Sequence, residues 1–96
     1  MGLSDIDSRE AVLKAVEEFN HLGRDAFLEK YGFGHARQYF LDHDGRLYDS
    51  KAIVGLAHGF EFPSAGPLKS SDFSGGQATV KRKLEELGFA VRVLHK

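Results

Sequence analysis

Residues 37–54, RQYFLDHDGRLYDSKAIV, decide the fold of this chain of 96 residues. Two short runs of aromatic and aliphatic residues lie on either side of Asp44-Gly45. Both residues of this dipeptide tolerate the positive φ angles of a tight turn, so the two runs are predicted to pair as an antiparallel hairpin. Asp49 or Ser50 is then placed to cap a helix with an apolar stripe. The stretch therefore predicts a hairpin that leads directly into a helix over about residues 51–58.

Two helices are predicted before this hairpin. Asp7 or Ser8 is placed to cap the first helix, in which apolar residues recur at helical spacing until Gly23. A shorter helix over residues 25–31 follows, and Gly32 is expected to end it because glycine accepts the left-handed conformation at a helix end. The two helices are expected to form a helical hairpin.

A loop, a helix and a strand are predicted after the hairpin. Residues 61–72 contain both prolines of the chain and are predicted to form a loop. Residues 74–87 have helical spacing, and Gly88 is expected to end that helix. Residues 89–94 are predicted to form a third strand. The order α-α-β-β-α-α-β indicates an α+β fold, with one domain over residues 1–96 and a three-stranded antiparallel sheet.

The composition is that of a soluble globular domain without a strong overall charge. Hydrophobic residues make up 42% of the chain, charged residues 28%, and the net charge is −1. Residues 1–48 carry 6 basic and 9 acidic side chains, whereas residues 49–96 carry 7 and 5. A local basic face can bind phosphates without a high net charge. With no cysteine, no signal peptide and no apolar run of about 18 residues, we expect a cytoplasmic protein without membrane contact.

The strongest sign of a ligand is the segment FSGGQATVKRKL, residues 73–84. A serine and a glutamine have capping-box spacing. The two glycines between them would let an anion approach the N–H groups exposed at a helix start, and cations follow one turn later. The alternative is a capped amphipathic helix whose cations face only water. The residues expected to contact phosphate here are Ser74, Gly75, Gly76, Gln77, Lys81 and Arg82.

A second helix start carries similar chemistry. Lys51 lies in the first turn of its predicted helix, where a cation opposes the helix dipole and gains from an arriving anion. Taken alone, Lys51 is better explained by a stem that lies over a neighbouring helix with its ammonium group in water. Ser50 precedes Lys51, and Lys69 and Ser70 lie in the loop between the two helix starts. Together these four residues could follow a phosphate backbone.

The sequence does not favour catalysis, a cofactor or a metal. The spacing of the five histidines matches no metal-binding pattern. His43 lies near Asp42 and Asp44, but an exposed turn explains this better than a metal site does. His58 is expected to be a hydrogen-bonded, partly buried residue or a cap. No nucleophile and base are recognisable as a pair.

Four motifs occur in an order that resembles a known module. They are ARQYFL at 36–41, DGRLYDSKAIVG at 44–55, FSGG at 73–76 and LGFAV at 87–91. They resemble the N-terminal head domain of ScoMcrA-like restriction endonucleases. The resemblance implies modification-dependent (type IV) enzymes that cut DNA carrying 5-methylcytosine or phosphorothioate linkages, with an HNH nuclease domain elsewhere in a longer polypeptide. Because nothing similar to an HNH site occurs in this chain, we expect a binding domain rather than an enzyme.

The resemblance further implies double-stranded DNA as the partner and 5-methylcytosine as the feature recognised. Arg37 is expected to contact a guanine edge. A methyl group needs an apolar pocket, for which Tyr39, Tyr48 and Phe73 are the candidates. Both reading in the groove and extrusion of the base are open. Other domains of the parent endonuclease are further expected partners.

A rival interpretation is a scaffolding head that docks onto the rest of the endonuclease instead of binding DNA. The near-neutral net charge fits this interpretation, as do the apolar residues Phe60 and Leu68 near the predicted loop. Tight association with a partner domain, without any affinity for a duplex, would favour it.

Overall fold

The structure, a computed structural model, describes residues 2–73 and 77–94. The predicted α+β fold is confirmed, and so is the order of its main elements. The helices and strands are α1 (Arg9–Leu22), α2 (Arg24–Tyr31), β1 (Tyr39–His43), β2 (Arg46–Asp49), α3 (Ser50–Glu61), α4 (Arg82–Glu86) and β3 (Ala90–Val93). Short helical turns are η1 (Leu3–Asp5), η2 (Ser70–Asp72) and the π-helical turn η3 (Gln77–Lys81).

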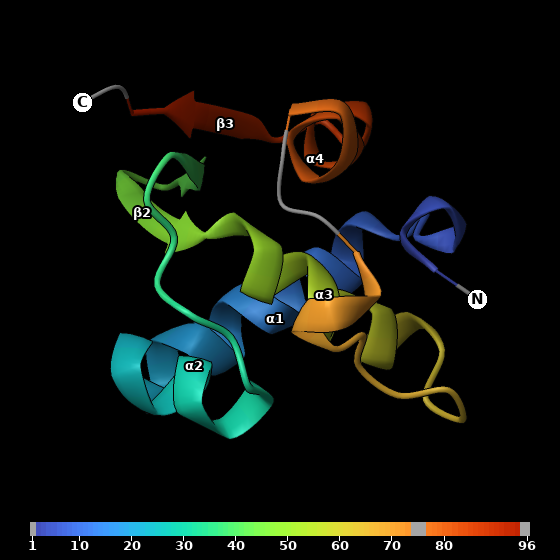
Figure 1. Ribbon diagram of the computed structural model, residues 1–96. Helices are drawn as coiled ribbons and strands as arrows, with labels where there is room; N and C mark the ends of the chain where they lie inside the picture. Colours follow the sequence, from blue (N-terminus) through green and yellow to red (C-terminus); the bar gives the residue numbers. More distant parts are fainter. Residues whose placement is uncertain (1, 74–76, 95–96) are drawn as a thin grey trace.

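Helices α1 and α3 pack side by side in the centre of the domain, with α2 on one side and the sheet and α4 on the other (Figure 1). Phe19 of α1 joins these layers, because its ring centroid lies 5.0 Å from that of Phe27 in α2 and 4.9 Å from that of Tyr48 in β2. All three rings are buried. Removal of such large apolar side chains from water is the main force that holds the layers together.

The three strands form an antiparallel sheet in the order β2-β1-β3. Leu41, at the centre of β1, is fully buried and lies opposite Tyr48 on one side and Val91 on the other. The turn between β1 and β2 has φ values of 51° at Asp44 and 77° at Gly45. This geometry confirms the hairpin predicted from the dipeptide.

Helix α3 is longer than predicted: the sequence indicated a helix over about residues 51–58 with Gly59 at its end, and this end is wrong. The helix continues to Glu61, and Gly59 lies inside it, close to the loop that follows the helix. A Cβ atom at Gly59 would lie only 2.8 Å from the nitrogen of Pro67, so the missing side chain lets the following loop pack on the helix. Gly55 acts in the same way, since a Cβ there would lie 2.6 Å from the ring of Phe33.

The chain before α1 is fixed by residues far along the sequence. Ser8 caps α1 as predicted, since its hydroxyl oxygen accepts a hydrogen bond from the Ala11 N–H at 3.1 Å. The Glu61 carboxylate accepts from the Ser8 N–H at 3.0 Å. Nζ of Lys83 donates to the Ile6 carbonyl at 2.8 Å, and Nη1 of Arg9 donates to a carbonyl after α4 at 2.9 Å.

The predicted helix over residues 74–87 has two parts where the structure describes it. The π-helical turn η3 comes first, and the shorter α4 follows. The expected start at Ser74 lies outside the described residues. Val80 and Leu84 are fully buried, as the apolar spacing predicted. Gly88 has a φ of 87° and Phe89 after it is buried, which confirms the predicted end of the helix.

Glu18 joins the first two helices at the surface. Its carboxylate accepts a hydrogen bond from the Tyr31 hydroxyl at 2.7 Å and from Nζ of Lys30 at 3.1 Å. The hydrogen bond from Tyr31, followed by that from Lys30, lowers the pKa of Glu18 below its usual 4.5. Burial, helped by the bond to Glu18, raises the pKa of Tyr31. The predicted helical hairpin of α1 and α2 therefore has a polar tie as well as its aromatic contacts.

Candidate nucleic-acid interface

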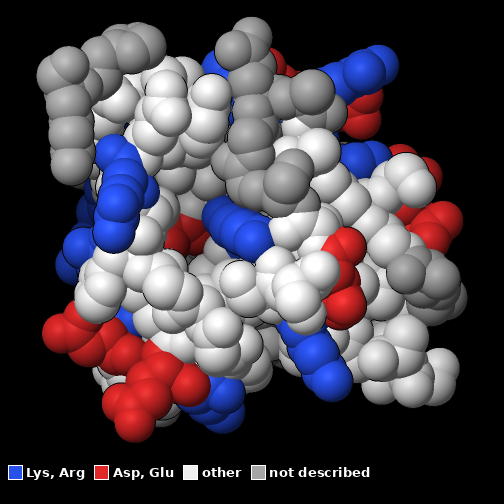
Figure 2. All heavy atoms as spheres, viewed as in Figure 1, with Lys and Arg blue, Asp and Glu red and all other residues white. Residues whose placement is uncertain are grey.

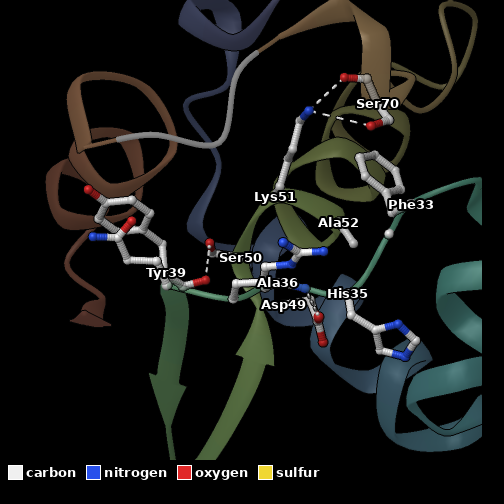
Figure 3. A pocket seen from close by; sticks show the side chains of 12 residues that line it. Phe33, His35, Ala36, Tyr39, Asp49, Ser50, Lys51, Ala52 and Ser70 are labelled. Carbon is white, nitrogen blue, oxygen red and sulfur yellow. Dashed lines mark hydrogen bonds between the residues drawn. The ribbon is translucent and has the colours of Figure 1, made fainter. Parts of the chain in front are cut away.

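A hollow of about 400 Å³ opens at the start of α3 (Figure 3). Three segments line it: residues 33–39, which connect α2 to β1 and include its first residue, residues 49–52 at the junction of β2 and α3, and Ser70 in η2. The hollow brings together five residues that the sequence nominated for DNA contacts. They are Arg37, Tyr39, Ser50, Lys51 and Ser70.

Asp49 fixes the floor of this hollow. Its side chain is only 2% exposed, and its carboxylate accepts hydrogen bonds from Nε and Nη2 of Arg24, both at 2.9 Å. The Ala36 N–H donates a third bond to the same carboxylate at 2.7 Å. The hydrogen bond with Asp49 raises the pKa of Arg24, so the guanidinium stays charged and neutralises the buried anion. Asp49 precedes α3 but makes no capping bond with its side chain, because these three donors occupy it.

The next two residues fix two other walls of the hollow. The Ser50 hydroxyl donates to the Tyr39 carbonyl at 2.8 Å. Nζ of Lys51 donates to the Ser70 carbonyl at 2.7 Å and lies 3.4 Å from the Ser70 hydroxyl oxygen. The ammonium group also lies 5.2 Å from the centre of the Phe73 ring. Lys51 therefore holds η2 against the start of α3. Taken alone, its position in the sequence favours a stem lying over a neighbouring helix with the ammonium group in water.

Exposed groups surround the opening of the hollow. Arg37 is exposed and Tyr39 is half-buried. Tyr39 lies on one side of the hollow, while Phe33, Lys51 and Ser70 lie on the other (Figure 3). Figure 2 shows basic side chains on both sides of a hollow on this face of the molecule. The opening thus combines aromatic surface with positive charge.

The cations nominated from the sequence differ in their partners. Lys81 pairs with Glu85 at 3.0 Å, and Arg82 pairs with Glu86 at 3.4 Å. In the part of the chain that the structure describes, Arg37, Lys51 and Lys69 have no carboxylate at ion-pair distance. An anion therefore meets uncompensated charge around the hollow but neutralised charge along α4.

The remaining nominated residues do not join this hollow. Phe73 and Arg82 line a second hollow of about 580 Å³ beside η1. Lys69 is exposed and lines a separate hollow next to Ser70. Gln77 begins η3, and nothing is described of its side chain contacts. Ser74, Gly75 and Gly76 lie outside the described residues.

The structure places two nominated residues where they cannot act as proposed from the sequence. Tyr48 is 2% exposed and packs in the core against Phe19, and its hydroxyl donates to Asn20 Oδ1 at 3.1 Å. Its ring is therefore part of the core and does not line a pocket for a methyl group. Ser50 is 1% exposed, and its hydroxyl proton is already used by Tyr39. Ser50 shapes the hollow and has no free donor for a phosphate.

Sequence reasoning missed the residues that build the hollow. Arg24 and Asp49 are 25 positions apart, and no local pattern indicates that they pair. Phe33 was not nominated either, although its ring, 7% exposed, forms part of the wall. A signal was present at Gly55, whose missing side chain makes room for that ring. No group of histidine or acidic side chains within residues 2–73 and 77–94 is arranged to hold a metal ion.

The architecture and the hollow can be compared with known proteins. A family model described as the ScoMcrA-like N-terminal head domain matches residues 4–93. The chain belongs to this family. One solved structure that this head domain resembles is that of ScoMcrA, described as a type IV phosphorothioation-dependent restriction endonuclease. The two are 34% identical with a TM-score of 0.64, over 93% of this chain and 13% of the ScoMcrA chain.

The comparison with ScoMcrA confirms the resemblance inferred from the four motifs. The head domain spans only about an eighth of the ScoMcrA chain. No curated protein matches it. None of the helices in the described part of the chain is long and apolar enough to span a membrane.

Proposed function

We propose that this head domain binds double-stranded DNA and recognises a modification, as the targeting module of a restriction endonuclease whose nuclease lies elsewhere. The observation that carries the proposal is a set of cations without a carboxylate partner among the described residues, of which Arg37 and Lys51 line a preformed hollow and Lys69 lines a neighbouring one. Unpaired basic groups on one face are the electrostatic feature that duplex binding requires. Membership of the ScoMcrA-like family supports the same role. Such a module would act on DNA in the bacterial cytoplasm.

The contacts of the proposed complex divide by chemistry. Lys51 and Lys69 supply charge to phosphates, which position the protein but carry no sequence information. Arg37 contacts a guanine edge, for which its planar fork is suited. The rings of Tyr39 and Phe33 offer apolar surface for a methyl group. We therefore propose 5-methylcytosine as the modification.

A phosphorothioate linkage is the second candidate, because ScoMcrA is described as dependent on it. A sulfur atom on the backbone would have to be recognised beside the phosphate-binding cations rather than in the apolar wall. Titration with three matched duplexes, unmodified, methylated and phosphorothioated, separates the candidates. Higher affinity for one modified duplex identifies its ligand, and equal affinity for all three would refute recognition of either modification while leaving general DNA binding intact.

The phosphate contacts can be tested by salt dependence. Each phosphate contact contributes about −0.9 to the slope of log affinity against log salt. Lys69→Ala should therefore flatten the slope by about one contact. Lys14→Ala is the matched control, since Lys14 is exposed on α1 and does not line the hollow. An unchanged slope in the Lys69 variant would remove this lysine from the interface.

Of the two apolar residues that supported a docking role for the head domain, only Phe60 offers exposed surface. Leu68 is buried at 7% exposure, and its N–H donates to the Gly55 carbonyl, so it offers no apolar surface. Phe60 is 40% exposed near the end of α3. Phe60→Ser should weaken association with the remainder of the endonuclease if this face docks there. Unaltered association, together with measurable duplex binding, would favour the DNA-binding proposal.

A further inference from the structure

The residues available to read a base surround a concave site. Direct reading in a major groove requires a projecting element, usually a helix or a two-stranded ribbon, that enters the groove. Arg37 and Tyr39 instead lie on the rim of the hollow, on a segment held against the domain. A duplex that keeps its bases stacked cannot bring them into such a site. We propose that the hollow receives a single nucleobase extruded from the duplex, an inference that rests on the proposed DNA-binding function.

The size and walls of the hollow suit one nucleobase. Its volume of about 400 Å³ lies in the range of about 300–1,000 Å³ that is typical of small-molecule sites. Tyr39 and Phe33 stand on opposite sides of it (Figure 3). Aromatic rings bind unstacked bases because every base presents a π-face. A methylated cytosine would therefore find apolar surface for both its ring and its methyl group.

Polar groups lie where an extruded nucleotide needs them. The Lys51 ammonium uses one strong hydrogen bond to Ser70, so donors remain for the phosphate that moves with the base. The Gln38 side chain is exposed on the lining and carries both a donor and an acceptor for a base edge. Arg37, on the rim, is placed to contact the guanine that the extruded cytosine leaves in the duplex. The residues of one hollow could thus contact the extruded base, its phosphate and the guanine with which the base was paired.

Three consecutive residues hold the hollow open before any ligand arrives. Asp49 fixes Ala36, Ser50 fixes Tyr39, and Lys51 fixes Ser70. Each bond ties a different part of the wall to the start of α3. A preformed site loses less conformational freedom on binding than a flexible one. This rigidity offsets part of the cost of unpairing and unstacking the base.

The test uses the complete domain and duplexes that carry one modified cytosine beside 2-aminopurine. Extrusion of the cytosine removes a stacking neighbour, so the fluorescence of 2-aminopurine should rise several-fold on binding. A duplex with a mismatch opposite the cytosine should bind at least about tenfold more tightly, because the mismatched base costs less to extrude. Unchanged fluorescence together with equal affinity for matched and mismatched duplexes would overturn the inference while the proposed function stands. Absence of any duplex binding would instead overturn the proposed function itself.

A variant that fills the hollow provides an independent check. Ala36→Phe places a ring in the lining, and we expect it to abolish both the fluorescence rise and the preference for the mismatch. Ala26→Phe, on the exposed face of α2, is the matched control and should keep both. Circular dichroism of the two variants checks that they are folded. A folded Ala36 variant that still raises the fluorescence as the unaltered domain does would exclude the hollow as the base-binding site.

Discussion

A polar side chain is buried at each end of α3, and the two side chains differ in how many of their polar atoms have hydrogen-bond partners. Asp49, at the start, is 2% exposed and accepts three hydrogen bonds, two of them from Arg24. His58, in the last turn, is 1% exposed and uses Nδ1 to donate to the Gly66 carbonyl at 2.8 Å. Its Nε2 atom has no hydrogen-bond partner in the described part of the chain. Both residues hold a loop against α3, but only Asp49 does so without an unpaired buried atom.

The difference indicates where the domain needs rigidity. The segment held by Asp49 carries Arg37 and Tyr39, whereas the loop held by His58 carries no residue of the hollow before Ser70. A fully paired buried charge fixes geometry strongly, because any displacement leaves that charge without partners. A single neutral hydrogen bond constrains its loop much less.

The largest effect is expected for Asp49→Ala. This change leaves the Ala36 N–H without its acceptor and the Arg24 guanidinium without its partner. Arg24 is 43% exposed and can turn to water, so we expect a loss of about 2–3 kcal/mol in the free energy of unfolding. Urea denaturation measures it. Asp42→Ala is the matched control, since Asp42 forms an exposed pair with Arg92 worth at most about 1 kcal/mol.

A smaller effect is expected for Gly59→Ala, which acts at the His58 end of the helix. The new Cβ would meet Pro67 at 2.8 Å, and the resulting overpacking exceeds the gain of about 1 kcal/mol in helix propensity. We expect a net loss of about 1–2 kcal/mol, measured by thermal unfolding. Gly34→Ala has no atom within 4 Å of its Cβ and should be nearly neutral. Stabilisation by the Gly59 change would show that the loop after α3 moves at little cost.

His58→Leu tests the C-terminal end of α3, where the buried side chain makes only one hydrogen bond to the described residues. The change removes the donor to Gly66 but also removes the unpaired Nε2, so the two effects partly cancel. We expect a loss of about 1 kcal/mol or less in the free energy of unfolding. The affinity for DNA should stay the same, since His58 does not line the hollow. A loss as large as that of Asp49→Ala would contradict the contrast between the two ends.

The smallest effect concerns Glu18, whose half-buried carboxylate lies at the surface between α1 and α2. Its pKa is lowered in the folded state, so its contribution to stability is present above pH 4.5 and is lost as pH falls through the lowered value. We expect Glu18→Gln to cost about 0.5–1 kcal/mol at pH 7 and less in acid. Urea denaturation at several pH values measures the difference. Glu17→Gln, at an exposed neighbouring position, is the matched control and should leave the free energy of unfolding at pH 7 nearly unchanged.

The hairpin, the starts of α1 and α3, and the helix ends at Gly23, Gly32 and Gly88 could be predicted because each depends on local chemistry. Asp44-Gly45 specifies its turn without help from the rest of the chain, and so does Gly32 at the end of α2. Gly59 shows the limit of this reasoning, because a glycine that looks like a helix end is explained by Pro67 across space. The pairing of Arg24 with Asp49 is equally invisible in the sequence, since two distant charges become partners only through the fold.

The residues predicted to contact DNA also divide into those that local sequence could identify and those whose position only the fold decides. The sequence indicated Arg37, Tyr39 and Lys51 through motifs and charge, and the structure gathers them around one hollow. Sequence reasoning missed a signal at Lys81 and Arg82, because Glu85 and Glu86 follow them at i,i+4 spacing in the predicted helix and neutralise them. The sequence could not distinguish Tyr48 in the core from Tyr39 at the rim. Both lie in predicted strands and on the same face of the sheet, since Tyr48 pairs with Leu41, two positions from Tyr39. They differ only in how far the rest of the domain covers them.

The bonds that fix the chain before α1 have a consequence for the order of folding. Arg9 and Leu87 are 78 positions apart, and Ile6 and Lys83 are 77 apart. Contacts between such distant residues pay the full entropy of loop closure and form late. On the ribosome, α1 can meet α3 once Glu61, the last residue of α3, has emerged. The segment before α1, however, must wait for α4 and the carbonyl after it, so the stretch that precedes the first long helix is among the last parts of this domain to be secured.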